Sequence, residues 1–477
     1  MDDTESKSVL GMRTPILVVV TSLVLGGIAL LVSYITGRFS RQLKTASPNK
    51  NVSGQQDGKT TDETGNSLGD ASNNPGLTAG SNGSASNTSS SGKRAKNKKR
   101  REAQQEFTHS WMVGALKGHT GPVLDMNFSS NGKFLASCAE DRSVQIWCTK
   151  DLASKERKSV RINLGYDHGT HVRWSPDGKA FIVHNAMGNS MDVWKLTKST
   201  KKGDFAFKSA TKVLEFPKHH TEDIVGMDIA CNGRFIITCS NINDLIVWDL
   251  KGEQLATIDT YLGSTHRARI SPCGRFVAVS GFTPDVKVWE VLFTKTGEFK
   301  QVAKAFDLAG HSSGVYDFNF CADTSHMASV SKDGTYRFYD TKIEFEKGED
   351  PRLLVKGSWD VATPASIAVS PNGEVVVVAH GSSLTFYSTV TGTLDTTIDD
   401  IFNGPITCLT FDAAGEFVLV AGDKQIKIFR NVAGYRAAIE SANRKLQQRQ
   451  SSATKERLEE TIAKSKSFLA EMGEPLS

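Results

Sequence analysis

The chain has 477 residues, of which 39% are hydrophobic and 23% are charged, with a formal net charge of +5. This composition excludes a collagen-like or wholly disordered chain and leaves room for a large core with additional segments. Residues 1–105 contain very few aromatic side chains, whereas all seven tryptophans lie between Trp111 and Trp359. The folded part is therefore expected to begin near residue 106.

The N-terminal region predicts a single membrane anchor. Residues 1–15 form a short polar leader, and residues 16–35 form a run of 20 residues without a charge. As a helix this run is about 30 Å long, which matches the hydrocarbon core of a bilayer. A cleaved signal peptide has a shorter apolar stretch that ends in a small-residue cleavage site, and this run fits neither feature. Arg38, Arg41 and Lys44 follow the run and two basic residues precede it, a small difference that favours a cytosolic position for the rest of the chain.

A disordered polar linker is expected at residues 36–105. Most of it consists of Ser, Asn, Gly, Thr and Asp, a composition that cannot bury enough apolar surface to fold. As a coil, its polar part of about 45 residues spans roughly 35–40 Å. Residues 93–101 hold a basic cluster, which can contact anionic lipid headgroups, RNA phosphates or an import receptor, or can simply keep the linker solvated. These candidate contacts to an anionic partner are Lys93, Arg94, Lys96, Lys98, Lys99, Arg100 and Arg101.

The sequence repeats between residues 106 and 431. Strand-like runs that end in an aromatic residue occur seven times, 41 to 54 residues apart. Further strand-like runs precede these ends, and dipeptides such as Asn131-Gly132 and Asn372-Gly373 between the runs suit tight hairpins. Seven small antiparallel sheets are therefore expected. The terminal aromatic residues are Trp147, Trp194, Trp248, Trp289, Tyr339, Tyr387 and Phe429.

Three of the units share a fixed internal spacing. His119, His220 and His311 each precede the terminal aromatic residue of their unit by 28 positions and a Ser or Thr by 18 positions. Units 1 and 5 begin with Gly-His, and unit 3 ends with Trp248-Asp249. These dipeptides are signatures of WD40 repeats, which the units therefore resemble. The resemblance implies an all-β fold, a seven-bladed WD40 β-propeller.

In the WD40 family the histidine, a strand hydroxyl, a turn aspartate and the aromatic residue form a hydrogen-bonded tetrad within one blade. Unit 3 has Ile242 at the aspartate position, and units 2, 4, 6 and 7 lack the histidine, so these units are expected to depend more on packing. A Ser-His-Asp hydrolase triad would occur once, whereas this pattern recurs, so no catalytic residue is predicted. By resemblance the structural tetrads are His119, Ser137, Asp141 and Trp147 in unit 1, His311, Ser329, Asp333 and Tyr339 in unit 5, and His220, Thr238 and Trp248 in unit 3.

The two ends of the repeat region are expected to close the ring, because an open ring would leave strand edges unpaired. Residues 109–116 form one more strand-like segment before the first unit, and we predict that it completes the seventh blade from outside. Residues 432–477 form a charged tail of helical composition with a sparse apolar stripe. A helix so polar could lie along the propeller, bind a partner helix or pair with itself. We predict a solvated helix that docks through a few side chains and breaks near Ser451 and Ser452.

No cofactor, metal site or small-molecule substrate is predicted. The seven cysteines are odd in number and show no CxxC spacing, which suits a reducing compartment rather than a zinc or disulfide framework. The sequence has no Walker loop and no Rossmann fingerprint. Function is expected in loops that vary between blades. The lysine-rich insertions at residues 197–212 and 294–304 are predicted to project from one rim, towards an acidic partner or towards solvent.

The anchor, basic linker, seven units and helical tail together resemble WD-repeat proteins of the endoplasmic reticulum membrane. This resemblance implies a non-enzymatic, single-pass scaffold whose propeller faces the cytosol. It also implies a role in the unfolded-protein stress response, with a stress-activated eIF2-alpha kinase, the translation machinery and RNA as partners. The alternative is a nucleotide-exchange catalyst for a small GTPase, although propellers of that kind carry the anchor after the propeller. Catalysed nucleotide release from a panel of GTPases would distinguish the two functions.

Overall fold

The structure, a computed structural model, describes residues 107–475 apart from 151, 155–156, 200–204 and 360–362. The predicted anchor at 16–35, the linker at 36–105 and the basic cluster at 93–101 lie outside these residues. Within the described part of the chain, no helix has both the length and the apolar character that a membrane crossing requires.

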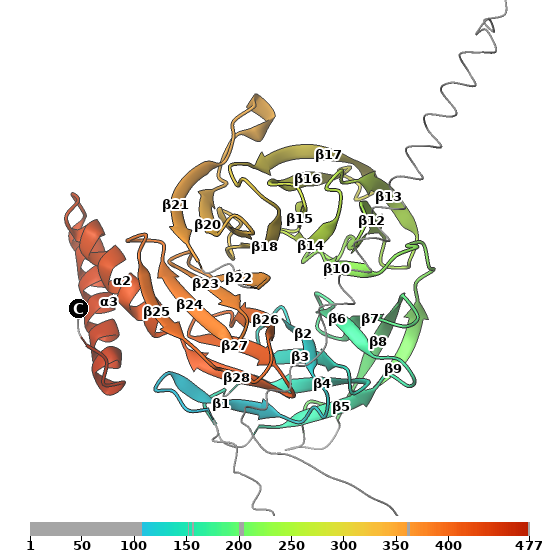
Figure 1. Cartoon of the computed structure of the whole chain (residues 1–477), viewed down its shortest axis with the longest axis horizontal. Coiled ribbons are helices and arrows are strands. Elements are labelled where there is room, and N and C mark those ends of the chain that lie inside the picture. The colour runs from blue at the N-terminus through green and yellow to red at the C-terminus, as the bar shows by residue number, and fades with distance from the viewer. Residues whose placement is uncertain (1–106, 151, 155–156, 200–204, 360–362, 476–477) are drawn as a thin grey trace, which may run out of the picture. The chain divides into compact units, whose positions relative to one another are not determined.

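The described residues form a ring of seven four-stranded antiparallel sheets, so the predicted seven-bladed propeller is confirmed (Figure 1). In blades 1 to 6 the strands follow one another from the centre outwards in chain order. Blade 1 is β2 (Val123–Phe128), β3 (Phe134–Ala139), β4 (Ser143–Cys148) and β5 (Ser159–Asn163); blade 2 is β6 (Gly169–Trp174), β7 (Ala180–Asn185), β8 (Ser190–Lys198) and β9 (Phe207–Glu215); blade 3 is β10 (Ile224–Ile229), β11 (Ile236–Ser240), β12 (Asp244–Trp248) and β13 (Gln254–Asp259). Blade 4 is β14 (Thr265–Ile270), β15 (Phe276–Gly281), β16 (Val286–Phe293) and β17 (Phe299–Leu308); blade 5 is β18 (Val315–Phe320), β19 (His326–Ser331), β20 (Thr335–Asp340) and β21 (Arg352–Ser358), with the short helix η1 (Phe345–Lys347) before β21; blade 6 is β22 (Ala365–Val369), β23 (Val375–His380), β24 (Ser383–Ser388) and β25 (Leu394–Ile398).

Blade 7 contains both ends of the propeller. Its strands β26 (Ile406–Phe411), β27 (Phe417–Gly422) and β28 (Gln425–Arg430) come from the end of the repeat region, and β1 (Met112–Lys117) pairs with β28 from outside. Leu116 of β1 lies opposite Ile426 and is buried. The seventh sheet therefore joins the two ends of the ring, as the strand-like segment at 109–116 predicted.

The hydrophobic core consists of separate clusters between and within adjacent blades, as expected when each sheet covers the face of the next. The middle strands are apolar on both faces because both faces are covered, and β23 is buried from Val375 to Ala379. The tight turns follow the sequence signals. The glycines of the Asn131-Gly132 and Asn372-Gly373 turns have φ of +65° and +72°, a conformation that L-residues with a side chain rarely adopt.

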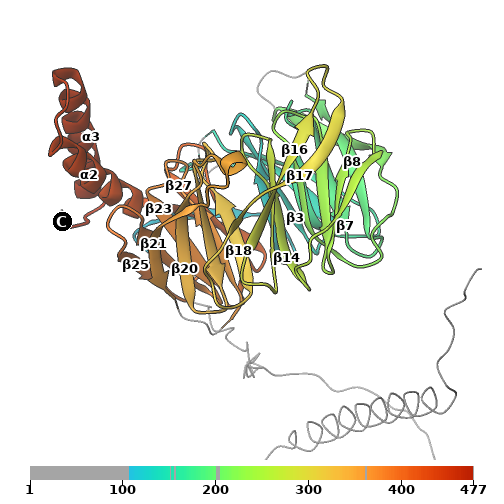
Figure 2. The ribbon, with the colours of Figure 1, turned by 90° about the horizontal axis from the view of Figure 1, so that it is seen from above.

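The charged tail forms two helices, α2 (Val432–Leu446) and α3 (Ser452–Glu471), which confirms the predicted helical segment (Figure 2). The side chains of Asn431 and Ser451 cap the two N-termini by accepting hydrogen bonds from backbone N–H groups. The helices contact each other through stacked Tyr435 and Phe468 rings, with centroids 3.9 Å apart. Ile439 and Leu469 are buried against blades 6 and 7, while most charged residues of the helices are solvent-exposed.

Candidate interaction face

The predicted tetrad residues of blade 1 lie together in one hydrogen-bonded chain. His119 Nε2 lies 2.8 Å from the Ser137 hydroxyl, which also accepts a hydrogen bond from Trp147 Nε1 at 2.9 Å. His119 Nδ1 lies 3.2 Å from both carboxylate oxygens of Asp141. The chain connects the loop before β2, the second strand, the following turn and the third strand, so it holds the loops of one face of the propeller against the sheet.

Blade 5 repeats this arrangement with a tyrosine in place of the tryptophan. His311 Nε2 lies 2.8 Å from the Ser329 hydroxyl, and Nδ1 lies 3.0 Å from Asp333 Oδ2. The Tyr339 hydroxyl donates to the carbonyl oxygen of Ala309 at 2.9 Å, in the loop that carries the histidine. The longer reach of a phenol thus connects the third strand to the same loop.

In blade 3 the tetrad carboxylate comes from a position that the sequence spacing did not predict. His220 Nε2 lies 2.6 Å from Thr238 Oγ1, which accepts from Trp248 Nε1 at 2.7 Å. Ile242 occupies the expected aspartate position, but Asp244, two residues later, places its carboxylate 2.5 Å from His220 Nδ1. The expectation that this blade lacks the carboxylate was wrong, because the turn presents the side chain from a neighbouring position that a fixed spacing misses.

The three tetrad imidazoles are held in the neutral form and are closed off from solvent. Burial is the largest influence on the pKa of His119, His220 and His311 and lowers each below its usual value. Their side chains are at most 2% exposed, and both ring nitrogens of each have a protein partner. A substrate could not reach these nitrogens without displacing the loops, so the geometry suits structural bracing rather than proton transfer.

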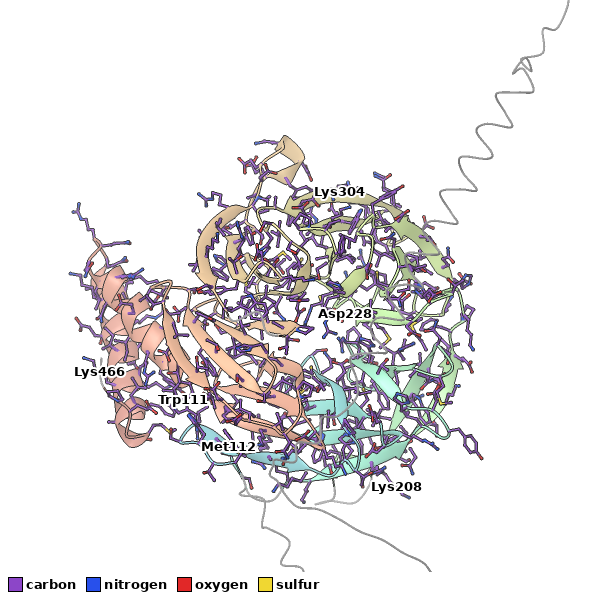
Figure 3. All side chains as sticks on the ribbon, in the orientation of Figure 1. Trp111, Met112, Lys208, Asp228, Lys304 and Lys466 are labelled. Carbon is purple, nitrogen blue, oxygen red and sulfur yellow. The ribbon has the colours of Figure 1, made fainter. Side chains whose placement is uncertain are left out.

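A charged network lines the central channel, a cavity of about 420 Å³ bounded by the inner strands. Asp125 and Asp228 both contact the guanidinium of Arg173, and Arg269 donates to both oxygens of Asp317. The same carboxylates accept backbone N–H groups from the inner strand of the next blade, for example Asp228 from Ile270 at 2.9 Å. Figure 3 shows Asp228 at the centre of the ring. These residues brace one blade against the next, and their three carboxylates balance the three arginines of the channel.

Exposed apolar side chains occur in the loops at one face of blades 2 to 4. In each blade, the connection between the second and third strands and the connection to the next blade leave from the same end of the sheet, because the strands alternate in direction. Five such connections carry a large apolar residue, with exposed fractions from 44% for Ile242 to 91% for Tyr166. We refer to this set as the blade 2–4 patch; it comprises Tyr166, Met187, Ile242, Tyr261 and Phe282.

Hydrogen bonds join the connections of the patch to their neighbours along the face, partly through the connection at residues 216–223. The carboxylate of Asp167, beside Tyr166, accepts from Met187 N at 3.0 Å and from the next amide at 2.7 Å. Further along, Asn189 Nδ2 donates to the Glu222 carbonyl at 2.9 Å, and Asn241 N donates to the Asp223 carbonyl at 2.9 Å. The patch is therefore carried by an ordered backbone, which lowers the entropy cost of binding a partner.

Further hydrogen bonds of this series hold the loops that carry Tyr261 and Phe282. Asn243 Oδ1 accepts from Leu262 N at 3.0 Å, and Phe282 N donates to the Ser264 carbonyl at 2.8 Å. Tyr261 has a φ of +50°, an uncommon conformation for a bulky residue and one that occurs preferentially at functional sites. Its ring is nevertheless 73% exposed. The chain thus holds an aromatic side chain outwards in a strained backbone conformation.

Acidic side chains surround the patch. Six carboxylates lie in or directly beside the connections of this face, against two lysines. One of these lysines is Lys287, whose ammonium donates to the Thr260 carbonyl at 2.7 Å. The second lysine is Lys218, which is exposed. The six carboxylates belong to Asp167, Glu222, Asp223, Asp244, Asp259 and Asp285. Apolar anchors inside an acidic border suit a partner that has apolar side chains beside Lys or Arg.

The lysine-rich insertions lie at the other end of the strands. They form the connections β8–β9 and β16–β17 and the adjoining strand ends, on the face opposite the patch. Both leave from the same face, as predicted. Residues 200–204 of the first insertion lie outside the described part. Lys212 is paired with Asp192 at 2.7 Å and with Glu215 at 2.8 Å, and Lys304 is paired with Asp307 at 2.5 Å. Figure 3 shows Lys208 and Lys304 at the circumference of the ring. The patch itself was missed, because its residues lie in non-repeating loops and their exposure cannot be read from the sequence.

Comparisons with known proteins agree with this architecture. The profile of the WD domain, G-beta repeat, matches residues 110–148, 302–340 and 390–430. Transducin beta-like protein 2 of Homo sapiens is 42% identical over 379 residues, which cover 79% of this chain and 84% of that protein. The Mus musculus protein of the same name is 42% identical over 378 residues, 79% of this chain and 85% of that protein. Nuclear distribution protein PAC1 of Arthroderma benhamiae is 27% identical over 256 residues, 49% of this chain and 54% of that protein.

The blades, the tetrads and the matched repeats define a WD40-repeat β-propeller, a class that generally serves as a non-catalytic scaffold for protein contacts. The identity extends over most of both chains. The protein therefore belongs to the transducin beta-like protein 2 family.

Proposed function

We propose that the protein is a non-enzymatic scaffold that recruits other proteins through the blade 2–4 patch. The observation that carries this proposal is the presence of five exposed apolar side chains in hydrogen-bonded loops of one face. Large exposed apolar patches on soluble domains usually mark interaction sites, and aromatic residues contribute most of the energy at such sites. The acidic border favours a partner segment in which apolar anchors alternate with basic side chains.

We further propose that residues 16–35 anchor the scaffold in the endoplasmic reticulum membrane with the propeller in the cytosol. The uncharged run of 20 residues supports an anchor, and the resemblance noted above supports the compartment. A tether of roughly 35–40 Å keeps bound partners close to the membrane and raises their effective concentration there. By the same resemblance, the partners include a stress-activated eIF2-alpha kinase and the translation machinery, with RNA or lipid headgroups at residues 93–101.

Proximity labelling of the full chain in cells tests the docking face and the anchor together. The Tyr261→Ser/Phe282→Ser variant is compared with Leu353→Ser/Leu354→Ser, which removes two other exposed apolar side chains from the outer strand β21. Loss of hot-spot aromatic residues costs about 2 kcal/mol or more, so labelling of patch partners is expected to fall by about 30-fold or to background. The matched β21 variant is expected to label the same proteins as the wild type.

A third arm of this experiment removes residues 1–40. The proposal predicts that the truncated chain leaves the membrane fraction and labels a dispersed cytosolic set. Equal labelling by both double variants would rule out the patch as the docking face, whereas unchanged membrane labelling after truncation would rule out only the anchor.

A further inference from the structure

The turn between the first and second strands has a common hydrogen-bond pattern in several blades. In blades 1, 2 and 6 a serine hydroxyl donates to the side-chain oxygen of the residue two positions later, at 2.6 to 2.9 Å. The same hydroxyl accepts the backbone N–H of the residue five positions later, at 2.9 to 3.0 Å. The serines are Ser129, Ser175 and Ser370. The pattern closes the turn and requires no ligand.

Blade 5 keeps this geometry but replaces two of its residues. Cys321 stands at the serine position, where its thiol donates to Asp323 Oδ1 at 2.7 Å and accepts the His326 N–H at 3.1 Å. His326 stands at the first residue of the second strand, where the corresponding residues of blades 1, 4 and 7 are Phe134, Phe276 and Phe417. The two replacements occur at the same turn, and together they add a sulfur and a nitrogen ligand beside a carboxylate.

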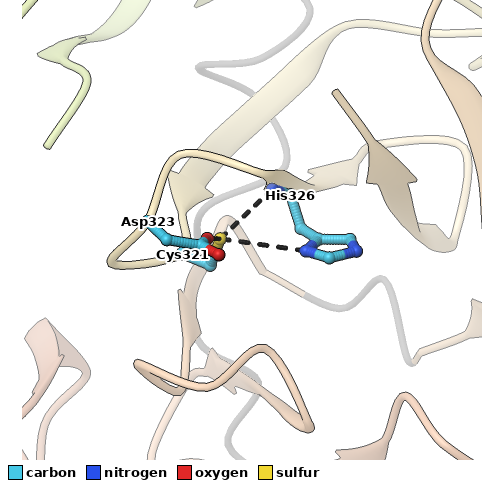
Figure 4. A group of neighbouring side chains, drawn as sticks. All are labelled: Cys321, Asp323 and His326. Atoms are coloured by element: carbon cyan, nitrogen blue, oxygen red, sulfur yellow. Dashed lines mark hydrogen bonds between the residues drawn. The ribbon is translucent and has the colours of Figure 1, made fainter. Parts of the chain in front are cut away.

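The structure brings these three donors together (Figure 4). Their ligand atoms all lie within 4.8 Å of one another, and His326 Nδ1 is 4.0 Å from the sulfur. The imidazole is oriented by stacking on Phe338, with centroids 5.1 Å apart and planes 5° apart. The backbone N–H and the hydroxyl of Ser325 donate to Asp323 Oδ1 at 3.0 and 2.6 Å, and such contacts around the ligands hold them in place.

We propose that Cys321, Asp323 and His326 form a binding site for a Zn²⁺ ion. Zinc binds thiolate at about 2.3 Å and imidazole or carboxylate at about 2.0–2.2 Å, which places the donors of one tetrahedral site roughly 3–4 Å apart. The pairing of thiolate with imidazole favours zinc over magnesium or calcium. Binding replaces the thiol proton that now lies between Cys321 and Asp323, and this proton passes to solvent.

The position of the turn fits an accessible site with three protein ligands. Asp323 is exposed and His326 is half-buried, so an ion can approach from solvent and keep water as its fourth ligand. Asp340 lies opposite His326 across the ladder, but its carboxylate is already paired with Arg352 at 2.6 Å. The proposed protein ligands are therefore the three residues of the turn.

Titration of the purified full chain in detergent with Co²⁺, a spectroscopic substitute for zinc, tests the proposal. We expect one bound ion, with a thiolate-to-cobalt charge-transfer band that disappears when Zn²⁺ is added. Cys321→Ser and His326→Phe each restore the residue that other blades use at that position, so both variants should keep the fold, which their thermal unfolding checks. Each is expected to weaken Co²⁺ binding by about tenfold or more, because each removes a direct ligand.

Cys231→Ser, which changes an exposed cysteine in blade 3, is the matched control and should leave the titration unchanged. The proposal is overturned if the wild-type chain gives no thiolate band. It is also overturned if Cys321→Ser retains the band, because the signal then comes from another cysteine.

Discussion

At the scale of single residues, a histidine tetrad braces the loops of each of three blades. The tetrads make the stability of the fold depend on pH. His119, His220 and His311 are buried and neutral, and burial lowers the pKa of each. In the unfolded chain their pKa returns to about 6.5. Below that value the unfolded chain binds more protons than the folded one, so acid destabilises the fold. His109, His171 and His184 act in the same direction, with the pKa of His171 lowered to about 3.

We therefore predict that the free energy of unfolding falls as pH drops from 7.5 to 5.5, by at most about 1.4 kcal/mol per histidine per pH unit. Urea unfolding at the two pH values measures this. His311→Gln should be less stable than wild type at pH 7.5, where its hydrogen bonds are lost, and should show a smaller dependence on pH. The tetrad carboxylates Asp141 and Asp333 do not contribute in this range, because their pKa values are lowered, to about 2 for Asp333, and their stabilisation is lost only below about pH 3.8. Asp228, Asp285 and Asp412 have raised pKa values and oppose the histidines, but they are the same in His311→Gln and in wild type, so the comparison of the two chains isolates His311. Equal pH dependence in the variant and the wild type would contradict the bracing role of His311.

The residue scale also shows what the sequence could predict. The 28- and 18-residue spacings predicted which histidine, hydroxyl and aromatic residues come together in blades 1, 3 and 5. They could not predict Asp244, because the backbone of a turn decides which of several nearby residues faces the imidazole. Nor could they predict that Tyr261 points outwards, since a left-handed residue in an irregular loop has no pattern to identify it.

At the scale of secondary-structure elements, both ends of the propeller depend on contacts that are distant in sequence. Trp111, just before β1, donates from Nε1 to Glu474 Oε1 at 2.6 Å, and Arg436 of α2 bridges Glu474 and Asp395. The N-terminal strand, the sixth blade and the end of the tail are thus joined in one cluster. Figure 3 shows Trp111 beside the tail helices and Lys466 on their outer side.

Closure of the ring by β1 gives a prediction about stability. Leu116 is 1% exposed and packs in the cluster that joins blades 7 and 1. Leu116→Ala should lower the free energy of unfolding by about 2–5 kcal/mol, because it leaves a cavity where the two ends meet. Lys424→Ala, at an exposed position in the neighbouring β27–β28 turn, should change it by less than about 0.5 kcal/mol. Denaturant unfolding that gave equal values for the two variants would show that β1 does not hold the ring closed.

Some secondary-structure elements could be predicted from the sequence, and others could not. The hydrophobic strands and the Asn-Gly turns predicted blade number and closure, because each blade repeats one local pattern. The docking of α2 and α3 rests on sparse contacts such as Leu469 and the Tyr435–Phe468 stack, and no sequence pattern predicts where the two helices dock. Only the helical composition and the break near Ser451 were readable in advance.

At the scale of the whole molecule, the two faces of the ring differ in the chemistry of their exposed side chains. One face carries the tetrad loops and the blade 2–4 patch, with exposed aromatic residues inside an acidic border. The other carries the lysine-rich hairpins, in which Lys212 and Lys304 are already paired with acidic residues of their own blades. The sequence singled out the lysine-rich hairpins, because charge is visible in a sequence, but it left open whether they face an acidic partner or solvent. The structure favours the first face because its apolar side chains are exposed and held in place.

The most direct test of this account is site-specific photo-crosslinking of the full chain in cells. A photoreactive phenylalanine analogue is placed at Phe282 in the patch, and in a parallel chain at Leu353 on the outer strand β21. We expect a discrete set of covalent protein adducts from position 282 that is absent from position 353. Adducts at 353 alone, or none at 282 beyond background, would contradict the claim that this protein functions by docking partners on the face of blades 2 to 4.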